Sequence, residues 1–446
     1  MENHNHKTIA LNNSPVIRWT VLFIVATAMM MGYFVNDVMS PLETILELPR
    51  SEGGLGWSSA DYGFFSGAGS FINVFLLMLF FSGIILDKMG IRFTGTLACS
   101  LMVAGTLIKY YGVTAPLTGE AFGLPQSVIV AATGFAVFGV GYEMTGITVS
   151  KAMVRWFTGH ELALAMGLQL AMARLGTAAA LSISAPIARH FTLSAPLLLA
   201  LGLLIVGLLA FLVFCLMDRR LDATVDTAAN SPSEEFRWSD IGQTLRSTGF
   251  WLITLFCVLF YSAVSPFLKF STKLMVMKYG VDADIAGFFS SIAPFGTILL
   301  TPLFGYVYDR YGRGVTLVIT GALLLTTVHF CFALPLHDST VALTLMILLS
   351  IGYSLAPAAL WPCVPKIIPL KCLGTAYSMI FFIQNFGRAI IPMFVGQANE
   401  HDPSYTSSML IFGATALGAT AVAVAMLIAD RRKGYGLQRP NICIQE

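Results

Sequence analysis

The sequence predicts an all-α membrane protein whose two halves each contribute six transmembrane helices. Of its 446 residues, 56% are hydrophobic and only 11% are charged, whereas a soluble domain carries about a quarter charged residues. Long apolar runs recur along the chain, and one short glycine–aspartate motif occurs twice, about half a chain apart. The net charge of +2, without a run of Lys and Arg, argues against a nucleic-acid partner.

Twelve segments are apolar over the roughly 20 residues that a helix needs to cross a bilayer. Their expected ranges are 17–40, 61–86, 93–113, 126–149, 161–187, 191–216, 248–275, 284–308, 315–335, 340–361, 372–396 and 404–429. The polar stretch 217–247 is expected to be a cytoplasmic linker between an N-terminal bundle, 17–216, and a C-terminal bundle, 248–429. The ends, 1–16 and 430–446, are expected to be cytoplasmic tails.

The charges of the loops predict the orientation of the chain in the membrane. If both termini are cytoplasmic, most of the 26 Lys and Arg residues lie in loops and tails on that side, in accordance with the positive-inside rule. The loops on the opposite side carry mainly Asp and Glu. The short loops, and the absence of an acidic dileucine signal before Arg18, favour a bacterial inner membrane over a lysosomal membrane.

The repeated motif is GxxxDxxG, which follows an apolar span in both copies and carries basic residues. The residues are Gly83, Asp87, Gly90 and Arg92 in the first copy and Gly305, Asp309, Gly312 and Arg313 in the second. Glycine lets helices approach closely, and an aspartate can pair with arginine or cap a helix end. The motif resembles the loop after the second helix in each half of a major facilitator superfamily transporter. That resemblance implies a conformational latch between the halves on the cytoplasmic side.

The same resemblance implies the major facilitator superfamily fold, in which two six-helix bundles rock around one central site. A charged residue in the middle of a span costs about 2.5 to 3.5 kcal/mol, so such residues are candidates for a functional site. Five of them fall on helices that this fold places at or beside the cavity: Asp37, Glu143, Arg174, Lys269 and Arg388.

Two longer stretches resemble the lysosomal dipeptide transporter branch of the superfamily. The first runs from Gly139 to Gly176 and the second from Ala359 to Ile390. The resemblance implies a uniporter of dipeptides that holds the two ends of the zwitterion between a carboxylate and an arginine. Glu143 and Arg174 match these two positions. The chemistry suits them, because a carboxylate can receive the peptide ammonium and a guanidinium can bind the peptide carboxylate through two parallel hydrogen bonds.

Other interpretations of these charges stay open. Glu143 and Arg174 could neutralise one another as a buried pair that joins two helices. Asp37 could bind the ammonium or a proton, or pair with Lys269 as a gate. Lys269 and Arg388 depart from the pattern of the branch, and they would leave the cavity with one net positive charge that favours more acidic substrates. Alternatively, Lys269 could extend to the outer interface, and Arg388 could pair within the C-terminal half.

Four uncharged residues complete the expected substrate-binding set: Tyr142, Tyr261, Trp361 and Gln384. For the aromatic members the alternative is packing between helices, and for Gln384 it is a hydrogen bond between helices.

Nothing in the sequence indicates an enzyme. The chain contains no HExxH, GxSxG or Walker motif, and its seven cysteines are scattered without a CxxC pair, so no cofactor or metal is expected. The expected partners are a small-molecule substrate and membrane lipid, for a monomer with no accessory subunit indicated. The alternative function is a proton-coupled carrier or an antiporter of small organic anions.

Overall fold

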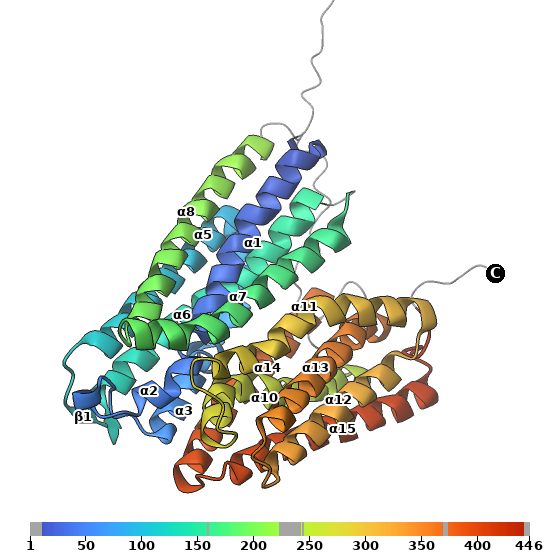
Figure 1. Cartoon of the computed structure of the whole chain (residues 1–446). Coiled ribbons are helices and arrows are strands. Elements are labelled where there is room, and N and C mark those ends of the chain that lie inside the picture. The colour runs from blue at the N-terminus through green and yellow to red at the C-terminus, as the bar shows by residue number, and fades with distance from the viewer. Residues whose placement is uncertain (1–10, 158–159, 223–241, 243–244, 369–372, 441–446) are drawn as a thin grey trace, which may run out of the picture.

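The computed structural model describes residues 11–157, 160–222, 242, 245–368 and 373–440, and nearly all regular structure in this part of the chain is helical. The helices form two bundles, one from each half of the chain (Figure 1). The bundles meet at the end that carries a hairpin of β1 (Glu120–Ala121) and β2 (Leu124–Pro125), which is called the closed end below. They diverge toward the end where helix α1 (Pro15–Asp37) begins.

The N-terminal bundle consists of long helices joined by short turns. Its elements are η1 (Leu11–Asn13), α1 (Pro15–Asp37), η2 (Ser40–Leu42), α2 (Glu43–Leu46), η3 (Arg50–Glu52), α3 (Ser59–Ala68), α4 (Phe71–Phe75), α5 (Met78–Thr114), α6 (Gln126–Phe157), α7 (Leu162–His190) and α8 (Ala195–Asp222). Pro15 lies in the first turn of α1, where a missing N–H costs nothing. Ser58 and Asp61 form a reciprocal capping box that starts α3.

The C-terminal bundle contains six long helices in the described residues. They are α10 (Thr248–Met277), α11 (Ala286–Tyr311), α12 (Gly314–Ala333), α13 (Ser339–Ile367), α14 (Leu373–His401) and α15 (Thr406–Lys433). Prolines lie inside α10, α11, α13 and α14, where each removes a backbone hydrogen bond and favours a bend.

The expected spans correspond to these helices, and within the described residues eleven helices are long and apolar enough to cross a membrane. The second span, 61–86, was expected as one helix but is broken into α3, α4 and the start of α5. Leu77, the residue before α5, has a left-handed backbone with φ of 54°, so α4 and α5 do not join into one continuous helix. At the other break, a Cβ on Gly139 would lie 1.8 Å from the carbonyl oxygen of Gly69, so the glycine lets α6 pack against the broken backbone.

Part of the predicted linker lies outside the described residues, namely 223–241 and 243–244, as do 1–10 and 441–446 of the predicted tails. Helix α8 continues to Asp222, past the expected end of its span. Its last turns are polar but well paired: Asp218 accepts a hydrogen bond from Trp156 Nε1 at 3.1 Å, and Arg92 contacts Asp222 at 2.6 Å. These contacts stabilise the helix beyond the apolar segment.

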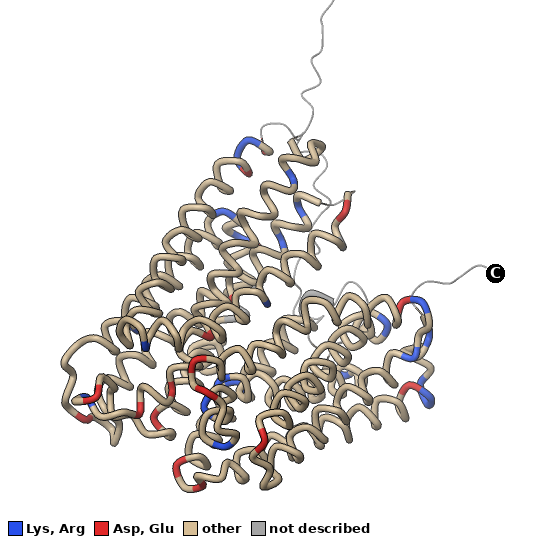
Figure 2. The backbone as a smooth tube through the Cα atoms, viewed as in Figure 1, with Lys and Arg blue, Asp and Glu red and all other residues tan. Residues whose placement is uncertain are grey.

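The charged residues are unevenly distributed between the two ends of the molecule. Figure 2 shows Lys and Arg gathered at the diverging ends of the two bundles, with much of the Asp and Glu toward the closed end. The last turn of α8 carries Arg219 and Arg220, and the last turn of α15 carries Arg431, Arg432 and Lys433. These ends lie on the side of the termini, which the positive-inside rule assigns to the cytoplasm.

The two halves touch along two seams near the closed end, where α3 packs on α14 and α7 packs on α11. Glycines bring backbone against backbone there. A Cβ on Gly63 would lie 2.5 Å from the carbonyl oxygen of Pro392, and a Cβ on Gly287 would lie 2.1 Å from that of Leu181. Such small residues allow close helix contact without interlocking side chains.

We expect Gly63→Ala and Gly287→Ala to push the helices of the seams apart. The protein should then shift toward a conformation in which the two halves separate at this end. Gly202→Ala in α8 is a matched control, because a Cβ there meets no atom within 4 Å. Distances between spin labels placed on the two halves at this end would measure the shift. Unchanged distances in both seam variants would show that the seams accommodate the added methyl group.

Candidate functional site

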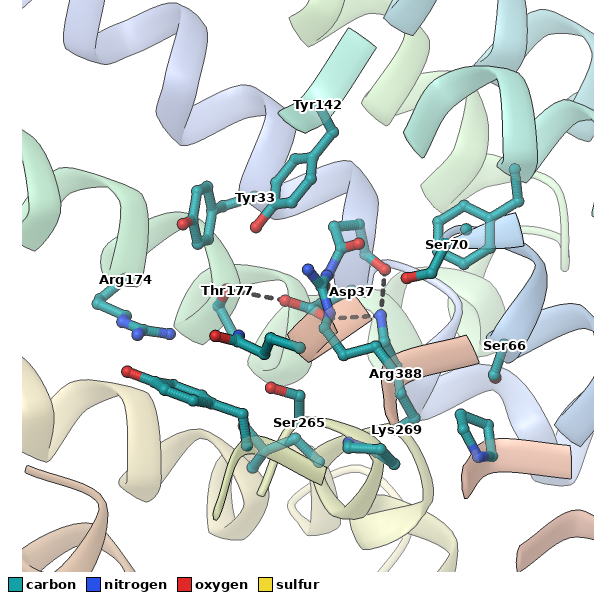
Figure 3. Close-up of a pocket in the computed structure, with 18 of the residues that line it drawn as sticks. Tyr33, Asp37, Ser66, Ser70, Tyr142, Arg174, Thr177, Ser265, Lys269 and Arg388 are labelled. Atoms are coloured by element: carbon teal, nitrogen blue, oxygen red, sulfur yellow. Dashed lines mark hydrogen bonds and ion pairs between the residues drawn. The ribbon is translucent and has the colours of Figure 1, made fainter. Parts of the chain in front are cut away.

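A cavity of about 120 Å³ lies between the two bundles and takes its walls from both (Figure 3). Its lining is largely polar or aromatic, in contrast to the apolar cores of the bundles. The lining residues are Tyr33, Asn36, Asp37, Ser66, Gly69, Ser70, Phe135, Tyr142, Arg174, Thr177, Tyr261, Ser265, Pro266, Leu268, Lys269, Tyr353, Gln384, Arg388 and Pro392. Four of the five charged residues that the sequence singles out are among them.

Asp37, the last residue of α1, is paired across the cavity with Lys269 of α10. Its Oδ1 lies 2.6 Å from Lys269 Nζ and accepts a second hydrogen bond from Asn36 Nδ2, while Oδ2 accepts one from Thr177 Oγ1 at 2.8 Å. Lys269 also donates to the carbonyl oxygen of Asn36. Lys269 therefore faces the cavity and does not extend to the outer interface. Of the alternatives left open above for Asp37, this conformation shows the pairing with Lys269.

Glu143 of α6 forms the second ion pair, with Arg388 of α14. The distance from Arg388 Nη1 to Glu143 Oε1 is 2.7 Å, and about a fifth of each side chain is exposed. The guanidinium also lies over the ring of Tyr142, 5.9 Å from its centre. The partner of Arg388 thus comes from the N-terminal half, not from the C-terminal half, and in this conformation the partner of Glu143 is Arg388 rather than Arg174.

Arg174 of α7 lines the cavity without a carboxylate partner among the described residues. Its guanidinium carbon lies 5.0 Å from the centre of the Tyr353 ring of α13. A ring face attracts a cation but does not neutralise it. Arg174 is therefore a cavity cation whose charge is available to an anionic group of a ligand.

The uncharged predicted residues divide into two groups. Tyr142, Tyr261 and Gln384 line the cavity, and Gln384 Oε1 is buried with no hydrogen-bond donor among the described residues. Trp361 lies one layer back, where its Nε1 donates to the hydroxyl of Tyr261 at 3.3 Å. Trp361 therefore positions the tyrosine and does not line the cavity.

The sequence prediction missed several small hydroxyl residues of the cavity, among them Thr177 and Ser265. A serine or threonine in a span usually bonds to its own helix, so its type alone carries little signal. Spacing supplies a better one. Thr177 lies three residues after Arg174, and Ser265 lies four residues before Lys269, so each shares a helix face with a charged cavity residue.

The two copies of the repeated motif adopt equivalent turns. Gly90 and Gly312 both have positive φ, 79° and 70°, and each separates two consecutive helical segments. An ideal Cβ on Gly83 or Gly305 meets no atom within 4 Å, so in this conformation neither glycine mediates a close helix contact.

The charged residues of the first copy pair within their own half. Asp87 contacts Lys151 at 2.5 Å, and Arg92 contacts Asp222 at 2.6 Å. In the second copy, the backbone N–H of Arg313 donates to the carbonyl oxygen of Gln438 at 2.7 Å. A latch that crosses between the halves on this side stays a prediction for the opposite conformation, in which these ends come together.

Comparisons with known proteins agree with this arrangement. Residues 111–392 match the Major Facilitator Superfamily. The lysosomal dipeptide transporter MFSD1 of Danio rerio is 30% identical over 333 residues, which cover 72% of this chain and 69% of the relative. The human MFSD1 is 27% identical over 374 residues, which cover 81% of this chain and 77% of the relative.

Solved structures agree in fold. A POT family transporter in complex with a thioalcohol-conjugated peptide superposes with a TM-score of 0.68 at 16% identity, covering 92% of this chain and 96% of that one. The nucleoside transporter NupG gives a TM-score of 0.66 at 14% identity, covering 92% and 98%. With two helical bundles around one cavity and a family match over most of its length, the chain is a multi-pass membrane protein that belongs to the major facilitator superfamily of transporters.

Proposed function

We propose that this protein moves dipeptides or similar small zwitterionic peptides across the membrane by rocker-switch alternating access, as a uniporter. The observation that carries the proposal is Arg174, a cation without a carboxylate partner among the described residues, in a cavity that Asp37 also lines and where Glu143 contacts the lining residue Arg388. The MFSD1 relatives named as dipeptide transporters support the same substrate class.

Arg174 is the proposed anchor for the carboxylate end of the substrate. A guanidinium presents several N–H donors in one plane, so it can bind both oxygens of a carboxylate at once. In the empty cavity it rests against the Tyr353 ring, a contact that costs little to exchange for a full negative charge.

Glu143 is the proposed acceptor for the ammonium end. Its side chain is 19% exposed and forms an ion pair with Arg388, whereas Asp37 is held by three side chains and is more deeply buried. A substrate ammonium would therefore displace Arg388 from Glu143 more easily than Lys269 from Asp37. Since Arg388 belongs to the C-terminal half and Glu143 to the N-terminal half, that exchange would loosen a tie between the halves and link binding to rocking.

A carrier of small organic anions, coupled to protons or working as an antiporter, is the second candidate. Around the cavity three cations, Arg174, Lys269 and Arg388, stand against two carboxylates, Asp37 and Glu143. One net positive charge would favour a substrate with a net negative charge. The compartment also stays a prediction: short loops favour a bacterial inner membrane with cytoplasmic termini, whereas the relatives reported above are named lysosomal.

Uptake of a labelled neutral dipeptide into proteoliposomes tests the proposed clamp. We expect uptake without a pH gradient in the native protein and a loss of about tenfold or more in Glu143→Gln and Arg174→Ala, because each removes a charge-assisted hydrogen bond worth about 1.5 to 3 kcal/mol. Glu52→Gln and Arg219→Ala are matched controls at exposed positions. Full uptake by either cavity variant would reject the clamp, and uptake of organic anions in place of dipeptides would favour the second candidate.

Arg388→Met tests the competition for Glu143. It removes the cation that occupies the carboxylate and leaves the cavity with balanced charge, so a neutral dipeptide should bind about tenfold more tightly while an acidic dipeptide loses affinity. Calorimetric titration of both ligands would measure the two changes. Weaker binding of both ligands would instead assign Arg388 a direct role in holding the substrate.

Asp87→Asn tests the predicted latch. The Asp87 side chain is 62% exposed, so its pair with Lys151 contributes at most about 1 kcal/mol to the present conformation. We therefore expect slower transport with unchanged dipeptide affinity, because the loss falls on the opposite conformation. A native transport rate in this variant would remove Asp87 from the latch.

A further inference from the structure

A second ion cluster lies outside the cavity, at the closed end between the two halves. Lys273 of α10 is 3.2 Å from Glu43 Oε1 and also contacts Glu47, and its Nζ donates to Ser59 Oγ at 2.5 Å. The Ser59 hydroxyl in turn donates to Glu47 Oε1 at 2.7 Å. The ammonium comes from the C-terminal half and its partners come from the N-terminal half, so the cluster exists only while this end is closed.

The cluster is short of positive charge. Two carboxylates share one ammonium, and the Glu43 side chain is fully buried while its Oε2 accepts no hydrogen bond from the described residues. The other titratable groups that face Glu43 are the phenols of Tyr62 and Tyr405, both buried, which supply no positive charge. A buried net charge is costly, and a proton on one carboxylate removes it.

We propose that Glu43 binds a proton when the closed end forms and releases it when the two halves part. Glu47 stays ionised because its side chain is 27% exposed and contacts both Lys273 and Ser59. When the halves separate, Lys273 leaves with the C-terminal half, water reaches both carboxylates, and Glu43 ionises as an ordinary surface glutamate does.

The proton then acts as a ligand of the closed end. The state closed at this end binds one proton more than the state open there, so acid favours closure and alkali favours opening. For one proton, the ratio of open to closed molecules rises by at most about tenfold for each pH unit, between the pKa values of the two states. The inference depends on the alternating access of the proposed function but not on the identity of the substrate.

The test measures opening of the closed end in the substrate-free, full-length protein in lipid nanodiscs. Probes introduced as unnatural amino acids at Phe122, which is 98% exposed in the β1–β2 turn, and at Leu336, which is 38% exposed in the loop before α13, report the distance between the halves. In the native protein, the open population should rise with pH. Glu43→Gln, which mimics the protonated side chain, should stay closed across the pH range, and Glu52→Gln should behave as the native protein.

Lys273→Met provides a second, independent variant. Without the ammonium, closure buries two carboxylates and requires two protons, so the pH response should become steeper and opening should begin at lower pH. The proposal would be overturned if the distance between the two probes in the native protein did not change with pH. It would also be overturned if the Glu43→Gln protein kept the native pH response. If Glu43→Gln does not fold, an unchanged pH response in Lys273→Met overturns it instead. Failure of dipeptide uptake would leave this readout intact, because no substrate is present.

Discussion

The interaction on which the structure depends is the pairing of charges across the boundary between the two halves. A lone charge in the membrane interior is expensive, so Asp37 in the cavity wall is held by Lys269 and Glu143 beside the cavity is held by Arg388, each cation coming from the opposite bundle. These pairs tie together two bodies that a transporter must move apart. A ligand that supplies its own charges can substitute for them, which gives binding a direct route to the relative motion of the bundles.

The apolar contacts at the same boundary suit that motion. The seams near the closed end place glycines against the backbone of the facing helix, as at Gly63 and Gly287, so few side chains have to interlock or repack when the helices separate. The bundles themselves contain the large buried aromatic residues, such as Trp156 and Phe250. If the glycine seams resist separation only weakly, the ion pairs between the halves determine which conformation is favoured.

The sequence predicted the spans and the charged cavity residues because a charge inside an apolar run is both rare and costly, whatever the fold. It did not predict the partners: Glu143 and Arg388 are far apart in the chain, and only the assembly of the two bundles brings them together. The break of the second span was equally hidden, since the left-handed backbone of Leu77 and the approach of α6 to Gly69 are tertiary effects. The sequence did not indicate Thr177 as a cavity residue, because threonine is common within helices.

The ion pairs at the cavity and in the Lys273 cluster share one polarity, whereas the more exposed pair between Arg189 and Asp284 has the opposite one. Asp37, Glu143, Glu43 and Glu47 come from the N-terminal half, and Lys269, Arg388 and Lys273 from the C-terminal half. A pair made from two copies of one half could have the same helix arrangement. In such a pair, however, these residues would face side chains of like charge. The ion pairs at the cavity and in the Lys273 cluster therefore favour contact between the two different halves over contact between two copies of one half.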